Sequence, residues 1–238
     1  MHRWVRSCDQ FLAACFGRSP ESWACIGLPL ATLTVGRYTP SGWAGQIPGL
    51  CVWLAMAMVA PGFWLWRQSS LEAWPQSRRV GRWIGILWCL EIVFNNGPWH
   101  SLNVWAIRAW VDNGVWLTTT LLVVYHAVER RRAGARRVDT VKAAATASLL
   151  GGVYAALTAL AFIHGGLQWV IADPISQAEW STVHVSFPLL RADDYFAYET
   201  LAGAIGHVLF LGLFAGTLIG GLTICLPRSW VQRNADRT

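Results

Sequence analysis

The sequence predicts an all-α membrane protein, a polytopic bundle of six transmembrane helices. Of its 238 residues, 54% are hydrophobic and 13% are charged, whereas soluble domains carry about 25% charged residues. Residues 47–66 form an uncharged apolar run, long enough to cross about 30 Å of hydrocarbon. Most lysines and arginines lie between the apolar runs and not within them. Together these observations favour a chain that crosses a bilayer several times.

The apolar runs define the expected elements in order. Residues 1–21 place arginines around a short apolar patch, which favours a helix lying on the membrane surface over a cleaved signal. Residues 22–226 then form one transmembrane domain, and 227–238 form a cytoplasmic tail. The expected spans are 22–37, 47–66, 82–98, 104–126, 142–164 and 196–226.

The longest connection between spans is 165–195, which contains the apolar patches GLQWVI and VHVSFPLL. Long connections in compact proteins often act as lids or binding segments. The sequence leaves three alternatives open for this connection: a lid, a re-entrant segment, or a seventh, partial span.

The distribution of basic residues predicts the orientation. If both termini are cytoplasmic, 16 of the 19 lysines and arginines lie on the cytoplasmic side, as the positive-inside rule requires. We therefore expect a protein of the inner membrane of a bacterial-type cell. The net charge of +6 reflects this topology and does not indicate nucleic-acid binding. The run ERRRAGARR at 129–137 is expected to attract anionic lipid.

Three ionisable residues, Glu91, Arg108 and Asp112, fall inside predicted spans. A charged side chain in hydrocarbon costs about 2.5–3.5 kcal/mol, so such residues usually face a protein cavity and have a function. The structural alternative is an ion pair between Arg108 and Asp112, which lie four residues apart on one helix face.

Helical spacing groups further polar and aromatic residues with these three on common faces. Glu199 can also be read as a solvated acid at the start of its helix. Gly212, Gly216 and Gly220 have the spacing of a close helix contact, which we expect to pack against the small residues of 142–164. The common faces are Trp88, Glu91 and Asn95 on the third span, Trp105, Arg108, Asp112 and Trp116 on the fourth, and Glu199, Gly203 and His207 on the sixth.

The chain contains 16 tryptophans. Many are explained by the aromatic belts of membrane proteins, but Trp88, Trp105 and Trp116 lie beside the acidic faces. Desolvation favours the neutral form of a buried carboxyl, which can protonate an alkene or epoxide. Aromatic ring faces then stabilise a carbocation by about 2 kcal/mol when desolvated. Belt and core packing remain the structural alternative for these rings.

Other chemistries find less support. The six cysteines form no C-x-x-C pair, and the histidines lack the spacing of a zinc or haem site. We therefore expect neither a metal nor a cofactor. Intramembrane carboxylates can also relay protons or bind cations. A proton- or cation-coupled transporter using Glu91 and Asp112 is accordingly the alternative function.

The segments LWCLEIVF at 87–94 and RAWVDNGVW at 108–116, together with the size and Trp-rich spans, resemble the integral-membrane terpene cyclases. This family is best known from fungal meroterpenoid and indole-diterpene pathways and has bacterial relatives. The resemblance implies proton-initiated cyclisation of a lipophilic prenyl chain or its epoxide. By the same resemblance, Glu91 would donate the proton, and Asp112 would hydrogen-bond to it or act as a second acid. It implies no metal and leaves the oligomeric state open.

Overall fold

A computed structural model describes residues 63–65, 67–68, 74–97, 105–186, 188 and 191–226. Throughout these ranges the regular structure is helical and contains no strand, which confirms the predicted all-α class. The surface helix at 1–21, the span at 22–37, nearly all of the span at 47–66, and the tail at 227–238 lie outside the described residues.

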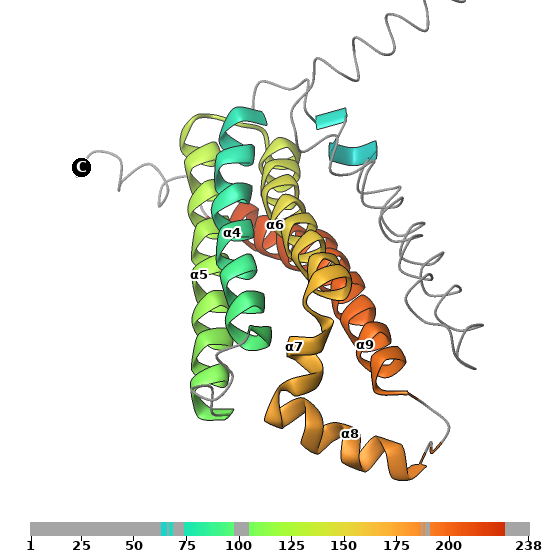
Figure 1. The fold of residues 1–238 in the computed structure, drawn as a ribbon. Helices are drawn as coiled ribbons and strands as arrows, with labels where there is room; N and C mark the ends of the chain where they lie inside the picture. The colour runs from blue at the N-terminus through green and yellow to red at the C-terminus, as the bar shows by residue number, and fades with distance from the viewer. Residues whose placement is uncertain are drawn as a thin grey trace, which may run out of the picture.

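Within the described residues four helical rods form the bundle, and they match the last four apolar runs (Figure 1). Three of them extend beyond the predicted spans through additional turns that carry arginines. The rods are α4 (Trp74–Asn96), α5 (Trp105–Arg132), α6 (Arg137–Gly165), and a continuous rod made of α9 (Ala192–Gly206), η2 (His207–Ala215) and α10 (Gly216–Cys225).

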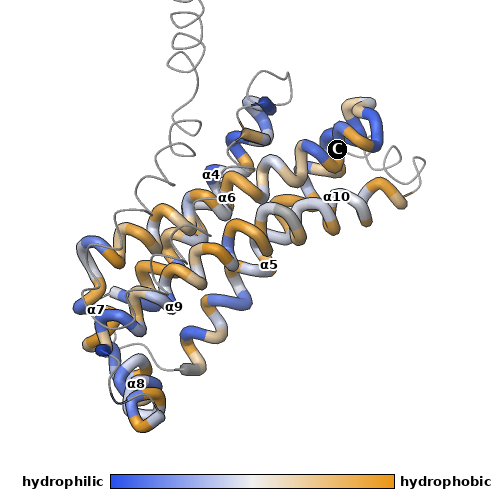
Figure 2. The backbone as a smooth tube through the Cα atoms, turned by 90° about the vertical axis from the view of Figure 1, so that its right-hand side faces the viewer, coloured by the Kyte–Doolittle hydropathy of each residue, from blue (hydrophilic) through white to orange (hydrophobic). Residues whose placement is uncertain are grey.

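In the part of the chain that the structure describes, two helices, Arg137–Gly165 and Ala192–Cys225, are long and apolar enough to cross a membrane. The helices α4 and α5 fall short of the same criterion, because they carry more polar and charged residues. Figure 2 shows hydrophobic residues running along the rods and hydrophilic residues gathering towards the ends. That α4 and α5 also cross the membrane stays a prediction.

Small residues let the last rod approach α6 closely. A Cβ placed on Gly216 would lie 2.8 Å from the Cα of Ala145, and one on Gly220 would lie 3.1 Å from the Cα of Val141. A Cβ on Gly212 would also clash with Leu149. In lipid, such close packing replaces the hydrophobic effect as a source of helix association. The predicted glycine contact face against 142–164 is thus confirmed.

The middle of the last rod, η2, is a π-helix, in which backbone hydrogen bonds span five residues instead of four. The N–H of Gly216 accordingly donates to the carbonyl of Leu211. The same carbonyl accepts a hydrogen bond from the Ser148 hydroxyl of α6. Gly152 of α6 lies against the first turn of η2, where a Cβ would be 2.8 Å from the His207 carbonyl oxygen. The π-helix is therefore fixed by α6 from the side.

The long connection forms two short helices, α7 (Leu167–Ala172) and α8 (Pro174–Ser186). The 13 residues of α8 extend about 20 Å at 1.5 Å per residue. This is too short for a complete span of about 30 Å. None of these 13 residues is buried, and α8 lies across one end of the bundle (Figure 1). By itself α8 is therefore too short for a complete span, and the choice between a lid, a re-entrant segment and a partial span stays open.

Candidate functional site

A cavity of about 430 Å³ lies between the bundle and α8. Residues from α4, α5, α6, α7, α8 and α9 contribute to its wall, together with His207 at the start of η2. Five residues that the sequence predicts as site residues line it: Asn95, Arg108, Asp112, Glu199 and His207. The helical spacing therefore identified residues that three separate rods of the bundle bring to one cavity.

The two predicted acids meet at a single amide. Asn95 Nδ2 donates to Glu91 Oε1 at 2.5 Å and to Asp112 Oδ1 at 2.9 Å. Glu91 and Asn95 lie on successive turns of α4, and α5 brings Asp112 across from the neighbouring rod. Asp112 lines the cavity, whereas Glu91 is linked to the wall through Asn95. Glu91 Oε2 and Asn95 Oδ1 are buried without a hydrogen-bond partner among the described residues.

Arg108 pairs with Asp173 and not with Asp112. Its Nη2 lies 2.7 Å from Asp173 Oδ1, and its Nη1 lies 3.1 Å from Oδ2. Only 13% of the Arg108 side chain and 3% of the Asp173 side chain are exposed. Two parallel bonds between a guanidinium and a carboxylate form a strong, directional pair. The alternative of an Arg108–Asp112 ion pair is therefore wrong, because each residue has a different partner.

Asp173 is a residue that the sequence analysis did not single out. It lies between α7 and α8, where Oδ2 accepts a hydrogen bond from the Ser176 N–H at 3.2 Å. The motif Asp-Pro-x-Ser at 173–176 is a signal for this cap, since Asp is favoured at the N-cap and Pro at the first helical position. The motif predicts the helix start, but it does not indicate that Arg108 binds the same carboxylate.

Aromatic rings form a cluster next to the cavity. Trp88 Nε1 donates to Thr119 Oγ1 at 3.1 Å, which fixes the indole. The ring of Trp88 makes edge contacts with Trp116 at 4.8 Å and with His207 at 4.9 Å between centroids. Neither indole lines the cavity, and His207 connects the cluster to it.

Two other predicted residues have different surroundings. Trp105 is the first residue of α5, and its side chain lies outside the described part of the chain. Glu199 is exposed and lines the cavity. Its position therefore agrees both with a site residue and with a solvated acid at the start of its helix. A further acid, Glu179 of α8, also lines the cavity and accepts a hydrogen bond from the Tyr195 hydroxyl. The sequence analysis missed Glu179 as a site residue, because nothing in its spacing places α8 over the cavity.

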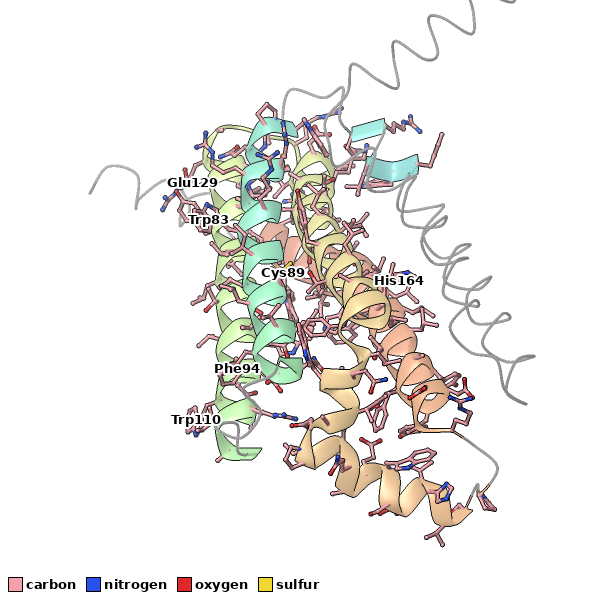
Figure 3. The ribbon with its side chains drawn as sticks, viewed as in Figure 1. Trp83, Cys89, Phe94, Trp110, Glu129 and His164 are labelled. Atoms are coloured by element: carbon pink, nitrogen blue, oxygen red, sulfur yellow. The ribbon has the colours of Figure 1, made fainter. Side chains whose placement is uncertain are left out.

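The other end of the bundle differs chemically from the site. Figure 3 shows Glu129 and Trp83 at that end, and Trp110 close to the level of the site but outside the bundle. Trp110 is 80% exposed, as expected for a ring at a membrane interface.

Within the described ranges, no group of three or more His, Cys, Asp or Glu residues is arranged to hold a metal ion.

Comparison with protein-family models, with curated proteins and with solved structures gives no match to this chain.

Proposed function

We propose that the protein is a membrane-embedded cyclase that protonates a prenyl chain, or its epoxide, and so initiates ring closure. The observation that supports this most is the junction of Glu91, Asn95 and Asp112 at the wall of the cavity. A general acid must lie within hydrogen-bond reach of the atom that it protonates. Among the two acids of the junction, Asp112 meets this condition for a molecule in the cavity.

In the proposed reaction the two carboxyls act as one acid. The protonated carboxyl transfers its proton to the terminal alkene carbon or epoxide oxygen, and the resulting cation closes the rings by attack of internal alkenes. Loss of a proton from the last cation returns the acid to its starting form. The product is therefore an isomer of the substrate, and the reaction needs no oxidant, reductant or metal. Asn95 would keep Glu91 and Asp112 close enough to exchange the proton.

The cavity and its surroundings support a lipophilic substrate. A volume of about 430 Å³ lies within the usual range of small-molecule sites. Trp88 and Trp116 reach the site through His207, so aromatic rings lie near any cation that forms there. A prenyl chain would enter sideways from the bilayer.

The proposal includes the topology. We propose six spans, both termini in the cytoplasm, and a bacterial-type inner membrane. The basic last turn of α5 and the arginines at the start of α4 and α6 lie at one end of the bundle, opposite α8 (Figure 1). This clustering is the pattern that the positive-inside rule describes for a cytoplasmic surface.

The test is product formation from membranes that contain the protein. Linear prenyl compounds, with and without a terminal epoxide, are incubated with these membranes and analysed by chromatography and mass spectrometry for new isomers of unchanged mass. Glu91→Gln and Asp112→Asn are expected to abolish or strongly reduce the isomer. Glu129→Gln, which changes an acid at the opposite end of the bundle (Figure 3), is the matched control and should remain active. If no compound in the panel isomerises, the cyclase proposal fails.

The charge of the cavity supports a second candidate, a proton- or cation-coupled transporter. Three carboxyls, those of Asp112, Glu179 and Glu199, line the cavity together with His207, and clustered intramembrane carboxyls are typical of proton relays and cation sites. The assay measures proton flux as acidification of the lumen of liposomes that contain the protein and a pH-sensitive dye. A transporter would lose flux in Asp112→Asn and Glu199→Gln, whereas a cyclase would show none beyond empty liposomes.

A further inference from the structure

A second cavity, of about 410 Å³, lies on the outer surface of α4, away from the proposed active site. The described part of its wall consists of residues of the first half of α4: Pro75, Arg78, Arg79, Arg82, Trp83 and Ile86. Trp83 marks this region in Figure 3, at the end of the bundle opposite α8. Three arginines in little more than one helical turn give the cavity a strongly positive wall.

An apolar stripe continues from this cavity along α4. Trp83, Ile86 and Leu90 are 57%, 48% and 61% exposed. Their spacing of three and then four residues places them on one helix face. They cover about 10 Å along the axis at 1.5 Å per residue. The positively charged cavity thus lies directly beside an exposed hydrophobic surface of the same helix.

We propose that this surface binds an anionic phospholipid. The phosphate would lie among Arg78, Arg79 and Arg82, and an acyl chain would lie along the stripe. Guanidinium groups match phosphate geometry through paired N–H donors. Basic pockets on the cytoplasmic side of membrane helices bind anionic headgroups. The proposal requires that α4 lies in a membrane, but it does not depend on the chemistry of the other cavity.

The run at 129–137, which the sequence predicts to attract anionic lipid, is the other basic surface, and the cavity places the lipid site on α4 instead. In the connection between α5 and α6, Arg132 pairs with Glu129 at 2.8 Å, and Arg136 pairs with Asp139 at 2.7 Å. The site is assigned to α4 by geometry, because this segment contributes no residue to the described wall of the cavity there. The segment therefore supplies a control of equal formal charge but different geometry.

Native mass spectrometry of the detergent-purified protein tests the proposal. Phosphatidylglycerol and phosphatidylcholine with identical acyl chains are added separately, and bound lipid is counted. We expect one phosphatidylglycerol to be retained and phosphatidylcholine to bind at least tenfold more weakly. About 1 kcal/mol per arginine near an anionic headgroup corresponds to about fivefold in affinity. Arg79→Gln should therefore weaken phosphatidylglycerol binding about fivefold, and the triple change at Arg78, Arg79 and Arg82 about 100-fold.

The control variant replaces Arg132, Arg136 and Arg137 with glutamine and should retain phosphatidylglycerol as the unmodified protein does. Inorganic phosphate in large excess should not displace the lipid, because it cannot occupy the apolar stripe. Equal losses in the two triple variants, equal binding of the two lipids, or displacement by inorganic phosphate would each overturn the proposal. If the triple variant at α4 does not fold, the Arg79→Gln variant and the comparison of lipids still decide the question.

Discussion

Replacing Asp173 with asparagine should release α7 and α8 from α5. The substitution removes the charge that neutralises the buried Arg108 guanidinium. It keeps a side-chain oxygen that can still accept a hydrogen bond from the Ser176 N–H. Any loss of stability should therefore come from the ion pair and not from the helix cap.

The expected loss of stability follows from the burial of the Arg108–Asp173 pair. Breaking a buried ion pair by removing one partner costs about 3–5 kcal/mol, because the remaining charge is left without compensation. We expect the lower value, about 3 kcal/mol, since 13% of the Arg108 side chain remains exposed to solvent. Arg108→Gln should cost a similar amount. The double variant should be less destabilised than the sum by about 2 kcal/mol or more, because it leaves no unpaired charge.

The assay is equilibrium unfolding in detergent micelles for the two single variants and the double variant. Arg136 and Asp139 provide a matched control, since they also make two bonds, at 2.7 Å and 3.3 Å, but the Arg136 side chain is 84% exposed. We expect no measurable coupling for this control pair, as is usual for surface ion pairs. Strict additivity of Arg108→Gln and Asp173→Asn would refute the argument from burial.

Three further predictions concern packing, a buried hydrogen bond and the proposed acids. Gly216→Leu should destabilise the fold by about 1–3 kcal/mol, because its Cβ would lie 2.8 Å from an α6 backbone carbon. Gly221→Leu, where nothing lies within 4 Å, should change the unfolding free energy by less than about 0.5 kcal/mol, and equal effects would contradict the packing argument. Ser77→Ala removes the partner 3.0 Å from the buried His126 Nε2 and should cost about 1–3 kcal/mol by the same measurement; an unchanged stability would show that the pair contributes nothing. Asn95→Leu should reduce isomer formation about 100-fold through misplacement of the acids without lowering the amount of protein in the membrane, and full activity would show that the amide does not organise them.

Helical periodicity predicted much of the site. The contact of Glu91 with Asn95 follows from their spacing of one turn, and Asp112 joins them because α4 and α5 are consecutive, adjacent helices. The glycine contact face was also predictable, because small residues at every fourth position can serve only a surface that another helix approaches closely. In each case the information lies within one helix or between two consecutive ones.

The missed contacts connect segments that are distant in sequence. Asp173 lies 65 residues from Arg108, in a connection whose path over the bundle no periodic pattern describes. Glu179 was missed for the same reason, since it reaches the cavity only because α8 crosses the end of the bundle. The π-helical segment η2 was not predicted either, because all its residues except His207 are apolar and their hydrogen-bond register depends on contacts with α6.

The π-helix also makes the length of the last rod a critical quantity. Residues before it, such as Gly203, line the cavity, whereas Gly216 and Gly220 after it contact α6. Deleting one residue within 207–215 would turn everything downstream by about 100° and carry both glycines away from α6. Apart from His207 and Gly212, the apolar residues of this stretch can replace one another at modest cost. During divergence, amino-acid substitutions in this stretch should therefore be tolerated more readily than insertions or deletions.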